Sequence, residues 1–118
     1  MWKFPKPPEK IKVLHRDYSV RPMTNEEDRT HDAAGIMWGS TATIAIGPEL
    51  EHYHALEVLI HELLHAIWKA MMAPEHMERA LEEAAVQRLS VGISAVLRDN
   101  PHLLKWIETM VKKDGRGT

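Results

Sequence analysis

The feature that most constrains this chain is a long segment of helical periodicity, from His52 or Tyr53 to about Met72. No glycine or proline interrupts it before Pro74, and its apolar residues recur every three or four positions, as on one face of an α-helix. These apolar residues are Leu56, Leu59, Ile60, Leu63, Leu64, Ile67 and Met71. The segment therefore predicts one long helix with an apolar face, which ends near the proline.

The same segment contains the motif His61-Glu62-Leu63-Leu64-His65. Residues four apart lie about one turn apart on one helical face, so both imidazoles can reach a single zinc ion. Glu62 lies about 100° to the side, where it can take a proton from a water molecule that the metal acidifies. The apolar stripe lies on the opposite side of the helix, so the two histidines need a partner outside the core. This favours a metal ion over the alternative of solvated or core histidines.

A third ligand is expected on the next helix, which is predicted over about residues 75–98. At about 1.5 Å per residue, a helix that turns back near His76 and runs antiparallel reaches the level of His65 at Glu82. Glu82 also lies among apolar residues, and a buried carboxylate is costly unless it is paired or bound to a metal. Glu83 lies about 100° away, toward the polar side. We therefore favour Glu82 as the third ligand, with Glu83 as the alternative.

These residues resemble the zincin metallopeptidases, and among them the gluzincins, in which a glutamate is the third zinc ligand. The resemblance is carried by Val58–Ile67 and by the pair Glu82-Glu83 on the following helix. Over roughly residues 34–101 the chain is also similar to ImmA/IrrE-like domains, SprT-like domains and small zincin-like proteins of phage and prophage origin.

The resemblance implies a bound Zn²⁺ held by His61, His65 and Glu82, with Glu62 as the general base. The tyrosine or histidine with which larger members stabilise the oxyanion has no clear counterpart in this chain. The candidates for that role are Tyr18, His31, Tyr53 and His54.

A strand is predicted over Thr41–Ile46 by the alternation of its side chains, with Gly35–Trp38 as its hairpin partner. In the proteins that this chain resembles, an edge strand beside the active helix binds an extended peptide through its backbone. The substrate contacts implied in this way are Thr43, Ile44, Ala45 and, from the preceding segment, His31. An ordinary strand packed on the helices is the equally weighted alternative.

The predicted fold class is α+β, with a small antiparallel sheet from the N-terminal half packed on three helices as a minimal zincin-like core. Residues 11–113 are expected to form this single domain, after an extended, proline-rich arm (1–10) and before a frayed tail (114–118). Ile11–Leu14 adds a short strand, and residues 100–112 the third helix.

Composition argues against several other classes of protein. Lys and Arg total 15 against 17 Asp and Glu, so a net charge of -2 argues against a dedicated nucleic-acid-binding protein. The absence of cysteine excludes disulfides and cysteine-based zinc fingers. No apolar run approaches the roughly 20 residues of a membrane span, and the N-terminus lacks the apolar core of a signal peptide. We therefore expect a cytoplasmic protein that does not bind membranes.

The expected function is a zinc-dependent metallopeptidase that acts on a peptide or protein substrate. The alternative is a zinc-bearing binding or regulatory module, related to phage or prophage, that does not cleave its partner. A third reading is a helical interaction protein in which the motif arose by chance and binds no metal. The sequence does not indicate the oligomeric state.

Overall fold

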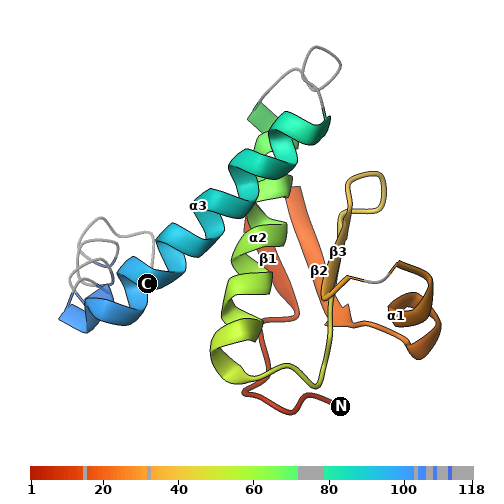
Figure 1. Cartoon of the computed structure of the whole chain (residues 1–118), viewed down its shortest axis with the longest axis horizontal. Helices are drawn as coiled ribbons and strands as arrows, with labels where there is room; N and C mark the ends of the chain where they lie inside the picture. Colours follow the sequence, from red (N-terminus) through yellow and green to blue (C-terminus); the bar gives the residue numbers. More distant parts are fainter. Residues whose placement is uncertain are drawn as a thin grey trace.

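The computed structural model describes residues 1–14, 16–31, 33–71, 79–102, 104, 105, 108 and 112 of the chain. Its elements are strands β1 (Lys10–Val13), β2 (Arg16–Pro22), β3 (Gly35–Trp38) and β4 (Thr43–Ile46) and helices α1 (Asn25–His31), α2 (His52–Met71) and α3 (Arg79–Asp99). A sheet from the N-terminal half followed by two long helices confirms the α+β fold (Figure 1). No helix in this described part of the chain has the length and apolar character that a membrane span needs.

The strands form one sheet in the order β1-β2-β4-β3. The pairs β1–β2 and β3–β4 are antiparallel, but β2 and β4 run parallel, with Val20 opposite Ile44. The chain leaves β2, passes through α1 and β3, and turns back into β4, which enters between β2 and β3. The sheet is therefore mixed, and our prediction of an antiparallel sheet is wrong. As a result β4 is an interior strand and β3 is an edge strand.

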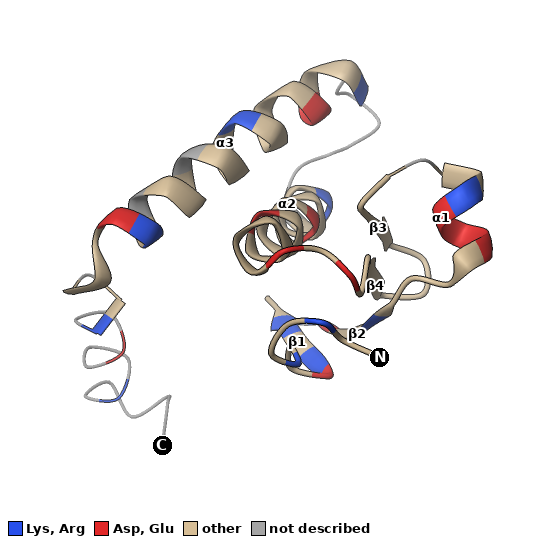
Figure 2. Cartoon of the chain, turned by 60° about the horizontal axis from the view of Figure 1, so that its bottom comes forward, with Lys and Arg blue, Asp and Glu red and all other residues tan. Residues whose placement is uncertain are grey.

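One face of the sheet carries the core. Side chains alternate between the two faces of a strand, and directly opposite residues of paired strands share a face. The core combines buried residues of the sheet with residues of α2: Val13, Tyr18, Val20, Ala42, Ile44, Ile46, Val58 and Ala66. Figure 2 shows α2 between this sheet and α3. One side of α2 is therefore covered by the sheet, and another is covered by α3.

A capping box begins α1 on the opposite side of the sheet. Glu27 N donates to Thr24 Oγ1 at 3.1 Å, and Thr24 N donates to Glu27 Oε1 at 2.9 Å. Glu27 also accepts two hydrogen bonds from the Arg21 guanidinium of β2, at 2.9 and 2.8 Å. Arg21 in turn lies over the Trp38 ring of β3, 5.2 Å from its centroid. These contacts attach α1 to the sheet away from α2.

The N-terminal arm is attached to the core. Lys3 N donates to Pro48 O at 2.8 Å, and the rings of Trp2 and Phe4, 5.2 Å apart, pack against the buried cluster. The predicted third helix over residues 100–112 is described only in part. Asn100 is not helical, and the other described residues of this range are helical: Pro101, His102, Leu104, Lys105, Glu108 and Lys112. The predicted frayed tail, 114–118, lies wholly outside them.

Candidate metal centre

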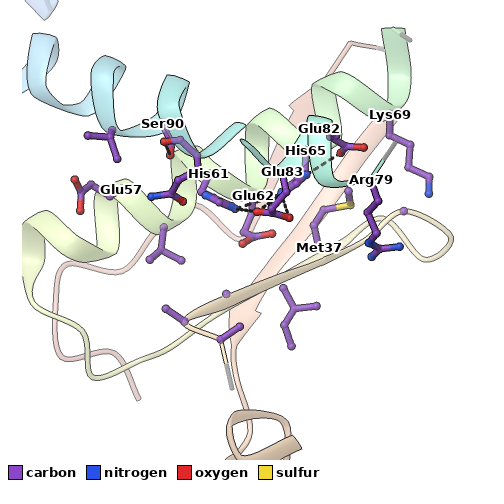
Figure 3. Close-up of a pocket in the computed structure, with 18 of the residues that line it drawn as sticks. Met37, Glu57, His61, Glu62, His65, Lys69, Arg79, Glu82, Glu83 and Ser90 are labelled. Atoms are coloured by element: carbon purple, nitrogen blue, oxygen red, sulfur yellow. Dashed lines mark hydrogen bonds and ion pairs between the residues drawn. The ribbon is translucent and has the colours of Figure 1, made fainter. Parts of the chain in front are cut away.

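A cleft of about 730 Å³ opens between β3, α2 and α3 (Figure 3). From α2 it is lined by a row of residues spaced one helical turn apart: Glu57, His61, His65 and Lys69. From α3 it is lined by a row of the same spacing: Arg79, Glu83, Gln87 and Val91. The histidines face Glu83 in the middle of the cleft, and β3 forms the remaining wall.

Three side chains in the middle of the cleft bring potential ligand atoms together. His61 Nε2 lies 3.2 Å from His65 Nε2, and Glu83 Oε1 lies 2.9 Å from the former and 3.3 Å from the latter. The ligand atoms of a tetrahedral zinc ion, each about 2.0–2.2 Å from the metal, lie about 3.3 Å apart. The group His61, His65 and Glu83 could therefore hold a metal ion.

Glu82 contacts the other ring nitrogen of His65. Its Oε2 lies 2.8 Å from His65 Nδ1. Because an ionised carboxylate only accepts hydrogen bonds, this contact favours the tautomer of a neutral ring in which Nδ1 carries the proton. The Nε2 atom of His65 is then unprotonated and faces His61 and Glu83. A carboxylate in this position orients a metal-binding histidine and raises its basicity.

The third member of the group is therefore Glu83, which corrects our preference for Glu82. The burial argument was sound, since the side chain of Glu82 is 22% exposed and that of Glu83 is 56% exposed. However, the more buried carboxylate is satisfied by His65 Nδ1. Adjacent residues differ by about 100° around a helix, so the approach of one helix to the other decides which carboxylate faces the histidines. The predicted turn near His76 lies outside the described residues.

Glu62 is the buried acid beside this group. The residue is only 7% exposed, and burial raises the pKa of its carboxyl group from 4.5 to about 7. The neighbouring His65 lowers this pKa and Glu83 raises it, both by smaller amounts. The side chain also lies against the start of β3, because a Cβ placed on Gly35 would be 3.2 Å from Glu62 Oε2. Glu62 thus lies between the His61–His65–Glu83 group and the sheet edge.

β4 is not the edge strand that our prediction of substrate contacts on it requires. β4 has β2 on one side and β3 on the other, so the backbone of Thr43, Ile44 and Ala45 has no free edge. None of the three lines the cleft, and Ile44 and Ala45 are fully buried. The prediction failed because it placed β4, rather than its hairpin partner, at the edge of the sheet.

The strand that borders the cleft is β3. Gly47 N donates to Ala34 O at 2.8 Å, and hydrogen-bonded pairs alternate along an antiparallel ladder. With Gly35 opposite Ile46, this alternation directs the backbone N–H and C=O groups of Gly35 and Met37 away from β4. These groups lie on the open edge of β3, and both residues line the cleft.

The remaining candidates do not gather at the metal-binding group. His31 lies on α1, with its ring 6.4 Å from that of Trp38, and does not line the cleft. Tyr18 is buried in the core, and Tyr53 contacts the far end of α3. Of the four oxyanion candidates only His54 lines the cleft, about two helical turns before the first histidine of the motif.

Among the cleft residues that were not predicted from the sequence are Lys69, Arg79 and Gly35. Extending the four-residue spacing of the histidines would have found Lys69. Finding Arg79 requires the pairing of the two helices, and it then follows from Glu83 by the same spacing. Gly35 has no local signal, because its importance comes from the close approach of α2, where a Cβ would lie 2.6 Å from Val58 Cγ1.

No protein-family model, curated protein or solved structure matches this chain. The residues of the cleft are therefore the features of the chain that bear on its function. These provide a group that could hold a metal ion, a buried carboxyl group with a raised pKa, and an open strand edge.

Proposed function

We propose that this chain is a zinc-dependent metallopeptidase that hydrolyses peptide bonds of a peptide or protein substrate bound in the cleft. The observation that carries the proposal is the position of Glu62. This buried carboxyl group lies between the His61–His65–Glu83 group and the open edge of β3. A base, a metal-binding group and a strand edge thus occur together in one cleft.

The donor set fits zinc. Two imidazole nitrogens and one carboxylate oxygen are a ligand set of catalytic zinc sites, which keep a fourth position open. When bound, zinc supplies a Lewis acid that polarises a carbonyl oxygen and lowers the pKa of a water molecule. His61, His65 and Glu83 would hold the ion, and Glu82 would keep His65 in the tautomer with an unprotonated Nε2.

Glu62 would serve as the general base. A base works best when its pKa lies near the operating pH, and burial gives Glu62 a pKa of about 7. A nearby cation favours the ionised form of a carboxyl group, so metal binding would prepare Glu62 to accept a proton. It would take this proton from the attacking water and then donate it to the leaving amine nitrogen. Its position next to His61 keeps it off the ligand face of the helix.

An extended peptide would bind along β3. The other edge strand, β1, carries Lys10 and Lys12, and charges of this kind discourage the addition of a further strand. β3 has no charged residue, and Gly35 and Met37 direct hydrogen-bonding groups to its open side. A peptide that pairs with these groups would run past Glu62 and the metal-binding group.

Metal content and proteolysis together test the proposal. We expect stoichiometric zinc in the purified full chain, and its loss in His61→Ala. Glu62→Gln should keep the zinc and lose about 10²-fold or more of the turnover of an unfolded protein substrate. Glu51→Gln removes an exposed carboxylate outside the cleft and should change neither. Absence of zinc, or turnover that survives in Glu62→Gln, would contradict the proposal.

One observation favours a second function, a zinc-bearing binding or regulatory module that does not cleave its partner. No tyrosine lines the cleft within the described residues, and His54 is the one candidate for stabilising an oxyanion that does. A binding module needs no such group. This function predicts zinc in both the unmodified chain and Glu62→Gln, equal peptide affinity in the two, and no turnover by either.

A further inference from the structure

The cleft carries opposite charges at its two ends. The row on α2 ends with Lys69, one turn after His65, and the row on α3 begins with Arg79, one turn before Glu83. Figure 3 shows these two cations at the same end of the cleft. The α2 row carries Glu57 at the opposite end. Charge along the cleft therefore changes sign across the metal-binding group.

The position of Lys69 is defined by the turn that follows β3. Its aliphatic stem lies against Gly39, where a Cβ would be 2.7 Å from Lys69 Cδ and Cε and 3.1 Å from Nζ. A larger residue at this position would have to displace the lysine. The absence of a side chain at Gly39 thus allows the ammonium group to lie beside the end of the edge strand.

Neither cation has an ion-pair partner within the described residues. Two other arginines there are paired: Arg21 with Glu27, and Arg98 with Asp99. Lys69 and Arg79 lie in the cleft without such a partner. Glu82 also lines the cleft at this end, but its carboxylate contacts His65 Nδ1. Two cations without an ion-pair partner can bind an anion, because a guanidinium and an ammonium group both donate strong hydrogen bonds to carboxylates.

We propose that this end of the cleft binds a carboxylate of the peptide, between Lys69 and Arg79. A step of four residues along a helix advances about 6 Å, or about two residues of an extended peptide. The carboxylate would therefore belong to a residue about two positions from the bond that lies next to Glu62. It is supplied either by an acidic side chain or by a free C-terminus. Elsewhere in the cleft the carboxylates of Glu57 and Glu83 repel such a group.

The inference rests on the proposed function in assuming a peptide in the cleft, but it does not require cleavage. The test therefore measures binding to the zinc-loaded Glu62→Gln variant. The probes are blocked, fluorescent peptides of about seven residues, identical except for one glutamate or glutamine moved through each position. A further pair contains no acidic side chain and has either a free or an amidated C-terminus.

We expect one peptide position at which glutamate binds about threefold to tenfold more tightly than glutamine at low salt, with the difference reduced by added salt. In the Glu62→Gln background, the double substitution Lys69→Gln and Arg79→Gln should abolish this preference. The double substitution Lys69→Glu and Arg79→Glu should reverse it, so that a peptide with lysine at this position binds more tightly than one with glutamate. Arg88→Gln, which removes an exposed charge outside the cleft, should leave it unchanged. If the peptide with the free C-terminus binds more tightly than the amidated one, and this difference depends in the same way on salt and on Lys69 and Arg79, the bound carboxylate is that of the C-terminus.

Peptides that bind without regard to charge would overturn this inference and leave the proposed function standing. A preference that persists in the double glutamine variant would also overturn it, because the carboxylate would then be bound elsewhere. Absence of binding by every peptide would contradict both the proposed function and this inference.

Discussion

Replacing Glu62 with glutamine should stabilise the metal-free protein, because burial of the ionised carboxylate opposes folding. In the unfolded chain this group ionises near pH 4.5, and in the folded protein it ionises near pH 7. Below pH 4.5 it is neutral in both states and there is no penalty. As the pH rises from 4.5 to 7 the folded state keeps a proton that the unfolded state has lost, so the free energy of unfolding falls.

The size of this penalty follows from the two pKa values. Each pH unit between them corresponds to about 1.4 kcal/mol, so the full penalty above pH 7 is about 3 kcal/mol. The amide of glutamine must itself be buried, which reduces the gain. We therefore expect Glu62→Gln to raise the free energy of unfolding by about 2–3 kcal/mol near pH 8, and by less than about 1 kcal/mol near pH 5.

Urea unfolding in the presence of a chelator, at these two pH values, measures the difference. Glu51→Gln is the matched control, because it removes an exposed carboxylate, and its effect should stay within about 0.5 kcal/mol at both pH values. Equal stabilities of the unmodified protein and Glu62→Gln near pH 8 would refute the reasoning. A difference of the same size at both pH values would show that packing or hydrogen bonding, and not ionisation, causes the effect.

Three further predictions concern the fold and the ligands. Gly35→Ala should lower the free energy of unfolding, measured in urea, by about 1–3 kcal/mol, because its Cβ would lie 2.6 Å from a methyl carbon of α2. In the control Gly47→Ala the nearest contact of the Cβ would be 3.4 Å, so the free energy of unfolding should fall by less. Hydrogen bonding to the Arg21 guanidinium is the largest cause that lowers the pKa of Glu27 from 4.5 to about 2. The stability that this pair contributes above pH 4.5 should therefore be lost as the pH falls toward 2. Glu27→Gln should make the free energy of unfolding depend less steeply on pH in this range. In chelator competition, Glu82→Ala should weaken zinc binding about 10–100-fold, and Glu83→Ala should weaken it further.

Secondary structure was well predicted where the pattern lies within one segment. The apolar spacing after His52 predicted a helix to about residue 72, and α2 ends at Met71. The hairpin pairing of Gly35–Trp38 with the following strand was also predicted and is confirmed, because the two segments are close in sequence. The parallel pairing of β2 with β4 was not predicted, because it depends on contacts distant in sequence. Alternation predicted one buried face for β4, yet Ala45 on the other face is also fully buried. Its cross-strand neighbours, Arg21 and Ile36, share that face and cover it, as expected for an interior strand.

The same distinction applies to the candidate site. His61 and His65 lie on one helix, so their spacing alone predicted that they would share a face. The third group comes from another helix, and the choice between Glu82 and Glu83 depends on how α3 approaches α2. Both carboxylates contact His65, one at each ring nitrogen. The sequence therefore predicted that these two carboxylates lie near the histidines but could not predict which ring nitrogen of His65 each one contacts.

The carboxylates at the candidate site repel one another in the metal-free protein, and a bound cation would offset this repulsion. The carboxyl groups of Glu62, Glu82 and Glu83 gather around the two histidines where α3 packs on α2, and the charge of Glu83 raises the pKa of Glu62. The packing of α3 on α2 buries Val86, Ser90 and Ser94 but leaves Leu81 56% exposed. The Ser94 hydroxyl has no hydrogen-bond partner within the described residues. A divalent ion shared by ligands from both helices would offset the repulsion and join α3 to α2 at the same place. Metal binding and the packing of α3 on α2 are thus expected to be coupled. The metal would offset the repulsion between the carboxylates, and the packing of α3 brings Glu83 to the two histidines.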